Sequence, residues 1–481
     1  MSGEIDQAEL RQALHRAADM IVDYLGNVGE YPVYPDVEPG DVANQLPAAP
    51  PEESESLDQI LDDYSRLIEP NVTHWNHPGF MAYFAITGSG PGILGEALAA
   101  ALNVNAMLWR TSPAATELEE RVCDWLRQMV GLPPEFRGHI NDTASISTLL
   151  SLGVARHQIP GLEARQKGLA GRAEISPLVV YVSEQAHSSC DKAALTLGVG
   201  LDNVRHIPVD EKFQMRSDKL QEAIANDRAA GRWPMAVVAT LGTTMTTSMD
   251  PVAEIAEICS REGVWLHVDA AYAGNAAICP EMQSAFAGWE RADSIVLNPH
   301  KWLFTPVDCS VLLVRDLDLL RSTFSLVPEY LGSSETDVVN LMDLGVQLGR
   351  RFRALKLWMV IRAFGAEGLR QQIRRHCRLA AELAGWIDQD DRFELTAPVP
   401  FSTVCFRCSE GDSPAEVDRI NQQILTRIND EGSIFLSHAV LNDRYSLRLT
   451  IGNLKTTAAH VEQAWRLIQT VAAEITESQG D

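Results

Sequence analysis

The stretch VWLHVDAAYAG (residues 264–274) decides the fold, together with SIVLNPHKW (residues 294–302). Each begins as a run of apolar, largely β-branched residues and then meets a polar side chain, Asp269 in the first and Asn298 in the second. Continuous apolar strands separated by helical segments are typical of a mostly parallel sheet that is buried on both faces. In such sheets the ligand site lies at the carboxyl ends of the strands. Both polar side chains therefore mark the expected position of a site.

Three further runs extend this pattern along the chain: LVVYV (178–182), MAVVATL (235–241) and CSVLLV (309–314). Helical periodicity precedes or follows them at 91–107, 114–130, 143–157 and Gly349–Gly365. The alternation of strands and helices predicts an α/β fold with a mostly parallel sheet.

The two ends of the chain differ from this middle part. The first 88 residues carry two amphipathic helices, at about 4–25 and 57–68, joined by a proline-rich acidic strap. Such helices bury little against each other, so we expect them to pack on a partner subunit. Helices and short strands alternate after residue 357, with helices at 366–386, 414–429 and 456–474, and strands at 393–396, 402–407, 433–437 and 445–451. The predicted division is an N-terminal helical segment (1–88), a large α/β domain (89–356) and a small α+β domain (357–481).

Composition narrows the possible partners. The chain has 481 residues, of which 40 are Lys or Arg and 65 are Asp or Glu, giving a formal net charge of −25. An acidic surface repels nucleic acid and anionic membranes, which argues against both as main partners. No apolar run approaches the roughly 20 residues of a transmembrane helix, and the acidic start MSGEIDQAEL is unlike a targeting peptide. We expect a soluble, cytoplasmic protein.

The eight cysteines form no dense framework. The single CxxC pair, Cys405 and Cys408, lies in the strand-like segment STVCFRCSE without a second pair or a histidine cluster. Spacing rules therefore favour ordinary strand residues over redox or metal chemistry, and we expect no metal.

Several polar side chains follow the predicted strands at the points where the strands end. Lys301 and Asp269 follow two of them, His187 follows a third, and the Gly/Thr turn with Thr243 and Thr244 follows a fourth. A lysine of lowered pKa forms a Schiff base with an aldehyde. An acid paired with a pyridinium nitrogen keeps a pyridoxal ring protonated, and the ring then serves as an electron sink. A histidine ring can lie over the cofactor.

A phosphate requires a helix N-terminus with free N–H groups and hydroxyls. The segment NDTASISTLL supplies these with Thr143, Ala144 and Ser145 at the start of a predicted helix. Taken singly, Thr143–Ser145 could be a plain helix cap, Lys301 a surface lysine, Asp269 a structural acid and His187 a hydrogen-bonded core histidine. All these readings would have to hold at once, so the combination favours pyridoxal 5′-phosphate.

The segments HVDAAYAG (267–274) and NPHKW (298–302) resemble those of the group II pyridoxal-phosphate-dependent amino-acid decarboxylases, most closely the aromatic-L-amino-acid branch. The resemblance extends over nearly the whole chain through these segments: NVTHWNHPGFMAYF (71–84), TSPAATELE (111–119), SEQAHSS (183–189), TLGTT (240–244), LGRRFRALKLW (348–358) and LRLTIGN (447–453). It implies an aspartate-aminotransferase-like fold (fold type I) with a seven-stranded sheet, and a homodimer with its site at the subunit interface.

The resemblance also implies roles for individual residues. Lys301 would be the Schiff-base lysine, Asp269 the partner of the pyridinium nitrogen, and His187 the ring stacked on the cofactor. The other cofactor contacts would be Ala271 on the opposite ring face, Thr244 near the ring substituents, and Ala144, Ser145, Asn298 and His300 at the phosphate.

The outcome of the reaction depends on Tyr330 and His187 in the family that the chain resembles. Tyr330 matches the tyrosine of the mobile catalytic loop, which returns a proton to the α-carbon after carbon dioxide leaves. Relatives that release aldehydes typically have phenylalanine for this tyrosine or asparagine for the stacking histidine. This chain keeps both the tyrosine (Tyr330) and the histidine (His187), so we expect plain decarboxylation to an arylalkylamine. An aromatic aldehyde synthase, a decarboxylase of non-aromatic amino acids and a non-catalytic scaffold are the alternatives.

The substrate pocket implied by the resemblance combines matches and departures. Gly349 leaves room for a large ring, and the other matching or aligned positions are Trp75, Tyr83, Phe84, Met107 and His187. A Pro–Thr pair common in the family is Ala85–Ile86 here, and Met107, flanked by Asn105, replaces a phenylalanine. Asp142 replaces a glycine beside the phosphate, and we expect it to point away or to cap the helix. Tryptophan, tyrosine, phenylalanine and dopa remain open as substrates.

Overall fold

The computed structural model describes residues 5–326 and 338–477. The chain divides into two compact units, which are described separately. The first comprises Met1–Ala85, Trp386–Glu394 and Phe406–Asp481, and the second comprises Ile86–Gly385 and Leu395–Cys405. The predicted boundary between residues 356 and 357 falls inside a long helix, α13 (Ala354–Asp388). The division into three segments stays a prediction.

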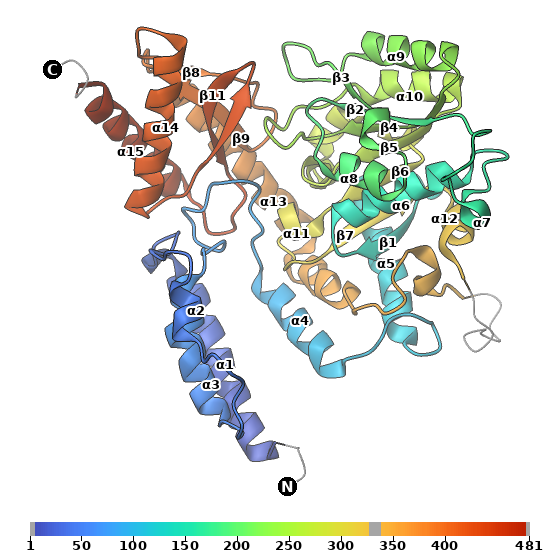
Figure 1. Cartoon of the computed structure of the whole chain (residues 1–481). Coiled ribbons are helices and arrows are strands. Elements are labelled where there is room, and N and C mark those ends of the chain that lie inside the picture. Colours follow the sequence, from blue (N-terminus) through green and yellow to red (C-terminus); the bar gives the residue numbers. More distant parts are fainter. Residues whose placement is uncertain (1–4, 327–337, 478–481) are drawn as a thin grey trace. The chain divides into compact units, whose positions relative to one another are not determined.

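The second unit is built on a seven-stranded sheet of order β1-β7-β6-β5-β4-β2-β3 (Figure 1). Its strands are β1 (Arg137–Asn141), β2 (Leu178–Ser183), β3 (Val204–Ile207), β4 (Trp233–Thr240), β5 (Trp265–Asp269), β6 (Ser294–Leu297) and β7 (Ser310–Val314). The five strands from β6 to β3 run parallel, whereas β7 runs antiparallel to both of its neighbours. The predicted mostly parallel α/β sheet is confirmed.

Strands β1 and β3 were not among the predicted strands. Both lie at the edges of the sheet, and both carry partly exposed residues. In contrast, every residue of β2, β5, β6 and β7 is buried. A strand at the edge of a sheet is partly exposed to solvent and can carry polar residues. The sequences of β1 and β3 therefore lack the continuous apolar run that identified the other strands.

Helices cover this sheet. Helix α6 (Ala144–His157) packs on β4, β5, β6 and β7, and α10 (Val252–Glu262) packs on β4 and β5. The other helices of the unit are α4 (Gly90–Leu102), α5 (Pro113–Met129), α7 (Ala164–Lys167), α8 (Ser189–Thr196), α9 (Ser217–Ala229), α11 (Pro299–Trp302) and α12 (Leu317–Phe324). Cover of this kind lets the central strands be apolar on both faces.

The prediction of a helix from Gly349 is wrong for its first residues, because α13 begins at Ala354. The backbone of Arg350 makes other bonds: its N–H donates to Asn105 Oδ1 (2.9 Å), and its carbonyl accepts the Ala106 N–H (2.9 Å). The predicted break at Gly365 is present as a kink with φ 63° and ψ 165°. Gly349 is therefore a loop residue beside Asn105.

The first unit carries a four-stranded sheet of order β10-β11-β9-β8, whose last two strands contain the unit boundary. Its strands are β8 (Phe393–Leu395), β9 (Thr403–Cys408), β10 (Ser437–Leu441) and β11 (Arg444–Thr450). The predicted strand at 433–437 is wrong, since β10 begins at Ser437. Asn442 and Asp443 have φ of 50° and 59° and join β10 to β11. A two-residue turn with positive φ at both positions is the favoured hairpin connection and sets this register.

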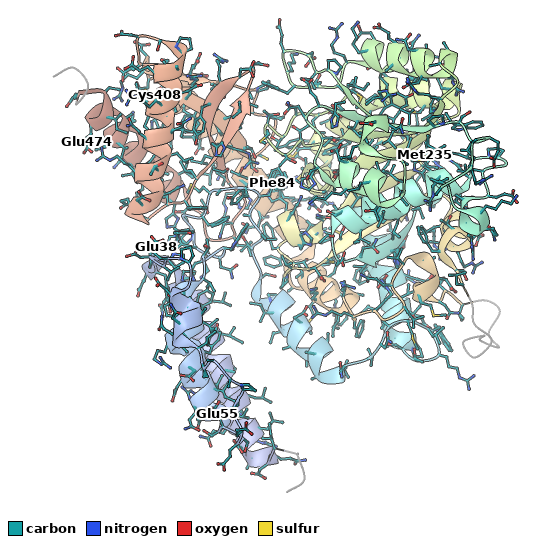
Figure 2. All side chains as sticks on the ribbon, viewed as in Figure 1. Glu38, Glu55, Phe84, Met235, Cys408 and Glu474 are labelled. Carbon is teal, nitrogen blue, oxygen red and sulfur yellow. The ribbon has the colours of Figure 1, made fainter. Side chains whose placement is uncertain are left out.

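The remaining helices of this unit are α1 (Gln7–Asn27), α2 (Asp41–Gln45), α3 (Leu57–Asp63), α14 (Pro414–Glu431) and α15 (Ala458–Glu477). Helices α1 and α3 lie side by side (Figure 1), with Arg16 paired to Asp58 and Asp62. Side chains stand outward along this pair, as Figure 2 shows around Glu55. In the described part of the chain, every helix is too short or too polar to cross a membrane.

Candidate active site

The carboxyl ends of β4, β5 and β6 bring the first predicted site residues together. Asp269 is the last residue of β5 and lies in register with Thr240 of β4 and Val296 of β6. The residue is only 6% exposed, and its Oδ1 accepts the N–H of Ala271 (3.1 Å). Ala271 in turn accepts the N–H of Asn298 through its carbonyl (3.0 Å). The residues predicted from the ends of β5 and β6 are therefore linked by hydrogen bonds, with the end of β4 in register beside them.

Lys301 lies on the short helix α11, directly after β6. Its N–H donates to the Asn298 carbonyl (3.0 Å), and the residue is partly buried. The next residue, Trp302, is fully buried and stacks on Tyr272 with ring centroids 4.5 Å apart and planes at 6°. Its Nε1 donates to Nδ1 of His376 (3.0 Å). Because Tyr272 closely follows Asp269, this stack ties the acid and lysine loops together.

The clamp formed by Tyr272, Trp302 and His376 was not predicted from the sequence. The aromatic residues one position after Lys301 and three positions after Asp269 were the available signal. Stacking of large rings stabilises by about 0.5–1.5 kcal/mol beyond the area that they bury. His376 comes from α13, far along the chain, so no local pattern connected it to the site.

His187 follows β2 and has a defined tautomer. The backbone N–H of Ser189 donates to its Nδ1 (3.1 Å), so the proton of the neutral ring is on Nε2. Partial burial and the charge of Lys301 lower the pKa of His187, while Asp269 raises it. These influences show that the three groups share one electrostatic environment. A neutral histidine with Nε2–H results.

The start of α6 has the features of an anion site. The helix begins at Ala144 after Thr143, and its first turn contains no acidic side chain. The first N–H groups of a helix have no acceptor within the helix. Thr143 and Ser145 are both exposed at this end. The predicted residues therefore present amides and hydroxyls toward solvent.

Asp142 is turned back onto its neighbours. Its Oδ1 accepts from the N–H (2.6 Å) and the hydroxyl (3.2 Å) of Thr143, and its Oδ2 accepts from Gln347 (3.3 Å). Its hydrogen bonds, as far as the chain is described, involve none of the first-turn amides of α6. The carboxylate therefore leaves those amides available for an anion.

His300 and Asn298 lie close to Lys301 and are almost completely buried. The Cys309 N–H donates to Nδ1 of His300 (2.8 Å), and burial together with Lys301 lowers the pKa of His300 to about 3. His300 is therefore neutral, with a donor at Nε2. Thr244 follows at the end of β4, whereas its neighbour Thr243 is buried and holds the turn through Thr246 and Ser248.

These residues fit pyridoxal phosphate. The buried atoms Asn298 Oδ1 and Thr240 Oγ1 lie at the strand ends and have no hydrogen-bond partner among the described residues. The Asp269 carboxylate has accepting capacity beyond the single Ala271 N–H. The α6 amides can bind a phosphate. The donor and acceptor set thus matches the two ends of the cofactor.

The predicted substrate residues fall into two groups. Met107 and Gly349 belong to the second unit, where Asn105 Nδ2 lies 3.4 Å from Met107 Sδ, and a Cβ at Gly349 would lie 3.8 Å from the same nitrogen. Trp75, Tyr83 and Phe84 belong to the first unit, where Trp75 and Tyr83 stack at 5.9 Å. Tyr330 lies outside the described residues. Substrate contact by these five residues and by His187 stays a prediction, as does the catalytic role of Tyr330.

A lysine on a tight turn, a buried acid, a neutral histidine and a helix N-terminus at one sheet edge define a pyridoxal-phosphate-dependent enzyme. The chain belongs to the pyridoxal-dependent decarboxylase family, whose conserved domain matches residues 39–409. Its cofactor is pyridoxal phosphate, and it is a carboxy-lyase.

Similar proteins cover almost the whole chain. Aromatic-L-amino-acid decarboxylase of Bos taurus is 41% identical, over 99% of this chain and 99% of its own. Phenylacetaldehyde synthase of Arabidopsis thaliana is 40% identical, over 98% and 97%. The crystal structure of Oryza sativa TDC with PLP and tryptamine is 37% identical, with a TM-score of 0.95 over 99% of this chain and 100% of that chain.

Proposed function

We propose that this enzyme converts an aromatic L-amino acid to the corresponding arylalkylamine and carbon dioxide. The observation that carries the proposal is the meeting of Lys301, Asp269 and neutral His187 at one sheet edge. The similar proteins are named for aromatic amino acids or an aromatic aldehyde, which supports an aromatic substrate. Tryptophan, tyrosine, phenylalanine and dopa are the candidates to compare.

Each residue then has a distinct task. When bound, pyridoxal phosphate supplies the electron sink that takes up the electron pair of the bond broken as carbon dioxide leaves. The Lys301 amine would hold the cofactor covalently, and Asp269 would accept the N–H of the ring nitrogen and keep that proton in place. The first turn of α6 and Nε2–H of His300 would hold the phosphate.

His187 and Tyr330 act on the substrate side. The neutral ring of His187 would lie against the bound cofactor and present Nε2–H, since Nδ1 accepts the N–H of Ser189. Tyr330 gives a proton to the substrate α-carbon, and this step determines that an amine leaves. An aromatic aldehyde synthase is the second candidate because one similar protein is a phenylacetaldehyde synthase.

A product panel tests the proposal. Purified enzyme is incubated with each of the four candidate amino acids, while amine, aldehyde, carbon dioxide and oxygen uptake are measured together. Equal amounts of amine and carbon dioxide without oxygen uptake are expected for at least one substrate. Stoichiometric aldehyde and peroxide would instead establish the synthase, and turnover of non-aromatic amino acids alone would refute the aromatic substrate.

Tyr330→Phe removes the hydroxyl that is assigned to proton return. We expect the variant to divert the product from amine toward aldehyde and ammonia, because the α-carbon then lacks its proton donor, and molecular oxygen takes up two electrons to give peroxide while water releases the ammonia. The ratio of aldehyde to amine is measured by chromatography, with peroxide measured enzymatically. Tyr64→Phe, which removes the hydroxyl of an exposed tyrosine on another part of the chain, serves as the control and should form amine as before. Normal amine formation by Tyr330→Phe would exclude the proposed role.

We also propose that the enzyme is a homodimer. Helix α4 exposes Leu94 (62%), Leu98 (49%) and Leu102 (60%) at the i, i+4 and i+8 positions of one face. Further exposed apolar residues lie on the helix pair of the first unit: Leu10, Leu14, Ile21, Val22 and Ile60. Apolar surface of this extent favours a subunit interface.

The eight cysteines are all free thiols, which supports a reducing compartment such as the cytoplasm.

A charge on α4 should break this dimer. We expect Leu98→Glu to weaken association by at least about 100-fold, because an isologous interface would bury two like charges without partners. Sedimentation velocity over a concentration series measures the change. Leu195→Glu, which places the same charge at an exposed leucine of α8, should stay dimeric. A Leu98→Glu variant that sediments like the unmodified enzyme would show that α4 is outside the interface.

A further inference from the structure

Helix α6 presents hydroxyl side chains to the large sheet. Ser147, Thr148 and Ser151 are fully buried on this helix, which packs across β4 to β7. A buried hydroxyl costs free energy unless it is hydrogen-bonded, so apolar residues are the usual choice at such contacts. Each of the three is hydrogen-bonded to a sheet residue. The catalytic roles assigned above use none of them.

Two of these hydrogen bonds and two further ones form one continuous chain. Trp265 Nε1 donates to Ser151 Oγ (3.0 Å), and Ser151 Oγ lies 2.7 Å from Ser294 Oγ. Ser294 Oγ is 2.9 Å from Nδ1 of His267, whose Nε2 is 3.3 Å from Thr148 Oγ1. We call Thr148, Ser151, Trp265, His267 and Ser294 the polar seam. It joins α6 to β5 and β6.

The indole of Trp265 fixes the direction of donation at one end of the polar seam. It can only donate, so Ser151 accepts from it. Burial lowers the pKa of His267 to about 4, so its ring is neutral, and one ring nitrogen donates while the other accepts. Linked hydrogen bonds strengthen one another inside a protein. The polar seam is therefore a stiff connection.

The polar seam lies between the two ends of the proposed cofactor site. Thr148 follows Ser145 by about one helical turn, and Ser145 belongs to the proposed phosphate end. His267 precedes Asp269 by two residues on the same face of β5. The contact between Thr148 and His267 thus lies between the phosphate end and the acid end. Apolar packing is non-directional and tolerates sliding, whereas this hydrogen bond holds the helix at one register.

We propose that the polar seam sets the separation between the first turn of α6 and Asp269, and so positions both anchors of pyridoxal phosphate. Its members are positioning residues, since they act through the anchors. The proposal rests on the assignment of these anchors under the proposed function. A ligand that uses both anchors senses their separation, whereas a ligand that uses one does not.

The test compares two ligands on the full-length chain after removal and re-addition of cofactor. Thr148→Val deletes the hydroxyl at nearly constant shape and leaves Nε2 of His267 without its hydrogen-bond partner. We expect the dissociation constant for pyridoxal phosphate to rise about 10-fold. Binding of pyridoxal, which lacks the phosphate, should change by less than about twofold. Thr148→Ser should restore the affinity because it restores the hydroxyl.

Two controls separate positioning from general loss of stability. Thr116→Val removes another fully buried threonine hydroxyl, which donates to the Ser112 carbonyl (3.2 Å), and should leave both affinities unchanged. Ser294→Ala opens the polar seam elsewhere and should reproduce the selective loss if Thr148→Val fails to fold.

Three outcomes would overturn the proposal. Folded Thr148→Val could bind pyridoxal phosphate as tightly as the unmodified enzyme, or it could lose affinity equally for both ligands. In either case the anchor assignments stand, provided that the unmodified enzyme prefers the phosphorylated ligand. Equal binding of both ligands by the unmodified enzyme would overturn the phosphate anchor and, with it, this proposal.

Discussion

Replacing Lys301 with alanine is expected to abolish amine formation while leaving the chain folded. The expected loss in turnover is roughly 10⁴-fold, because the variant loses the amine that holds the cofactor covalently. Lys301 lies on a turn fixed by its buried neighbour Trp302, so truncating the lysine leaves that support intact. Turnover with the best aromatic substrate and the thermal unfolding temperature measure the two expectations.

A second variant distinguishes covalent chemistry from charge. Lys301→Arg keeps a positive charge but cannot form the covalent bond, so it should be as inactive as Lys301→Ala. Borohydride reduction before mass spectrometry should attach the cofactor to the unmodified chain and to neither variant. Full turnover by Lys301→Ala would remove the basis of the proposed function.

Asp269→Asn should give the second largest effect, a loss of roughly 10³-fold in turnover. The amide oxygen can still accept the Ala271 N–H, so the loop keeps its hydrogen bond. The neutral side chain no longer holds a proton on the cofactor ring nitrogen, and the ring becomes a weaker electron sink. The rate and the visible absorbance of the bound cofactor as a function of pH should both change.

Asp293→Asn is the matched control for Asp269→Asn. Asp293 is also a largely buried acid that accepts a backbone N–H, from Leu266 (2.7 Å), but it precedes β6 rather than ending a strand. Turnover per bound cofactor should be unchanged in this variant. Equal losses in the two variants would mean that Asp269 has a structural role only.

The strands of the fold could be predicted where burial leaves a local mark. Central strands such as β2 and β6 are buried on both faces, so their sequences are uninterrupted apolar runs. The hairpin of β10 and β11 was misplaced because Asn442 and Asp443 were not recognised as its turn. The start of α13 was misplaced because Arg350 bonds to Asn105, a partner that helical periodicity does not reveal.

The candidate site shows the same contrast. Asp269, Lys301 and His187 were predictable because each follows a strand, and parallel strands bring such ends to one edge. The residues that hold them in place could not be predicted. His376 is hydrogen-bonded to Trp302, and Thr148 to His267, although the members of each pair are far apart in the chain. Nothing in the neighbourhood of Thr148 distinguishes a sheet-facing hydroxyl from a solvated one.

The sequence by itself determined the central strands and the cofactor, and it predicted the residues that we propose to carry the chemistry, because these depend on residue type and local order. Tertiary structure alone decided the tautomer of His187, the clamp on Trp302 and the polar seam under α6. A hydrogen bond or a ring stack requires two groups within a few ångströms at a defined angle. Only the folded backbone specifies that geometry for residues that are distant in the chain.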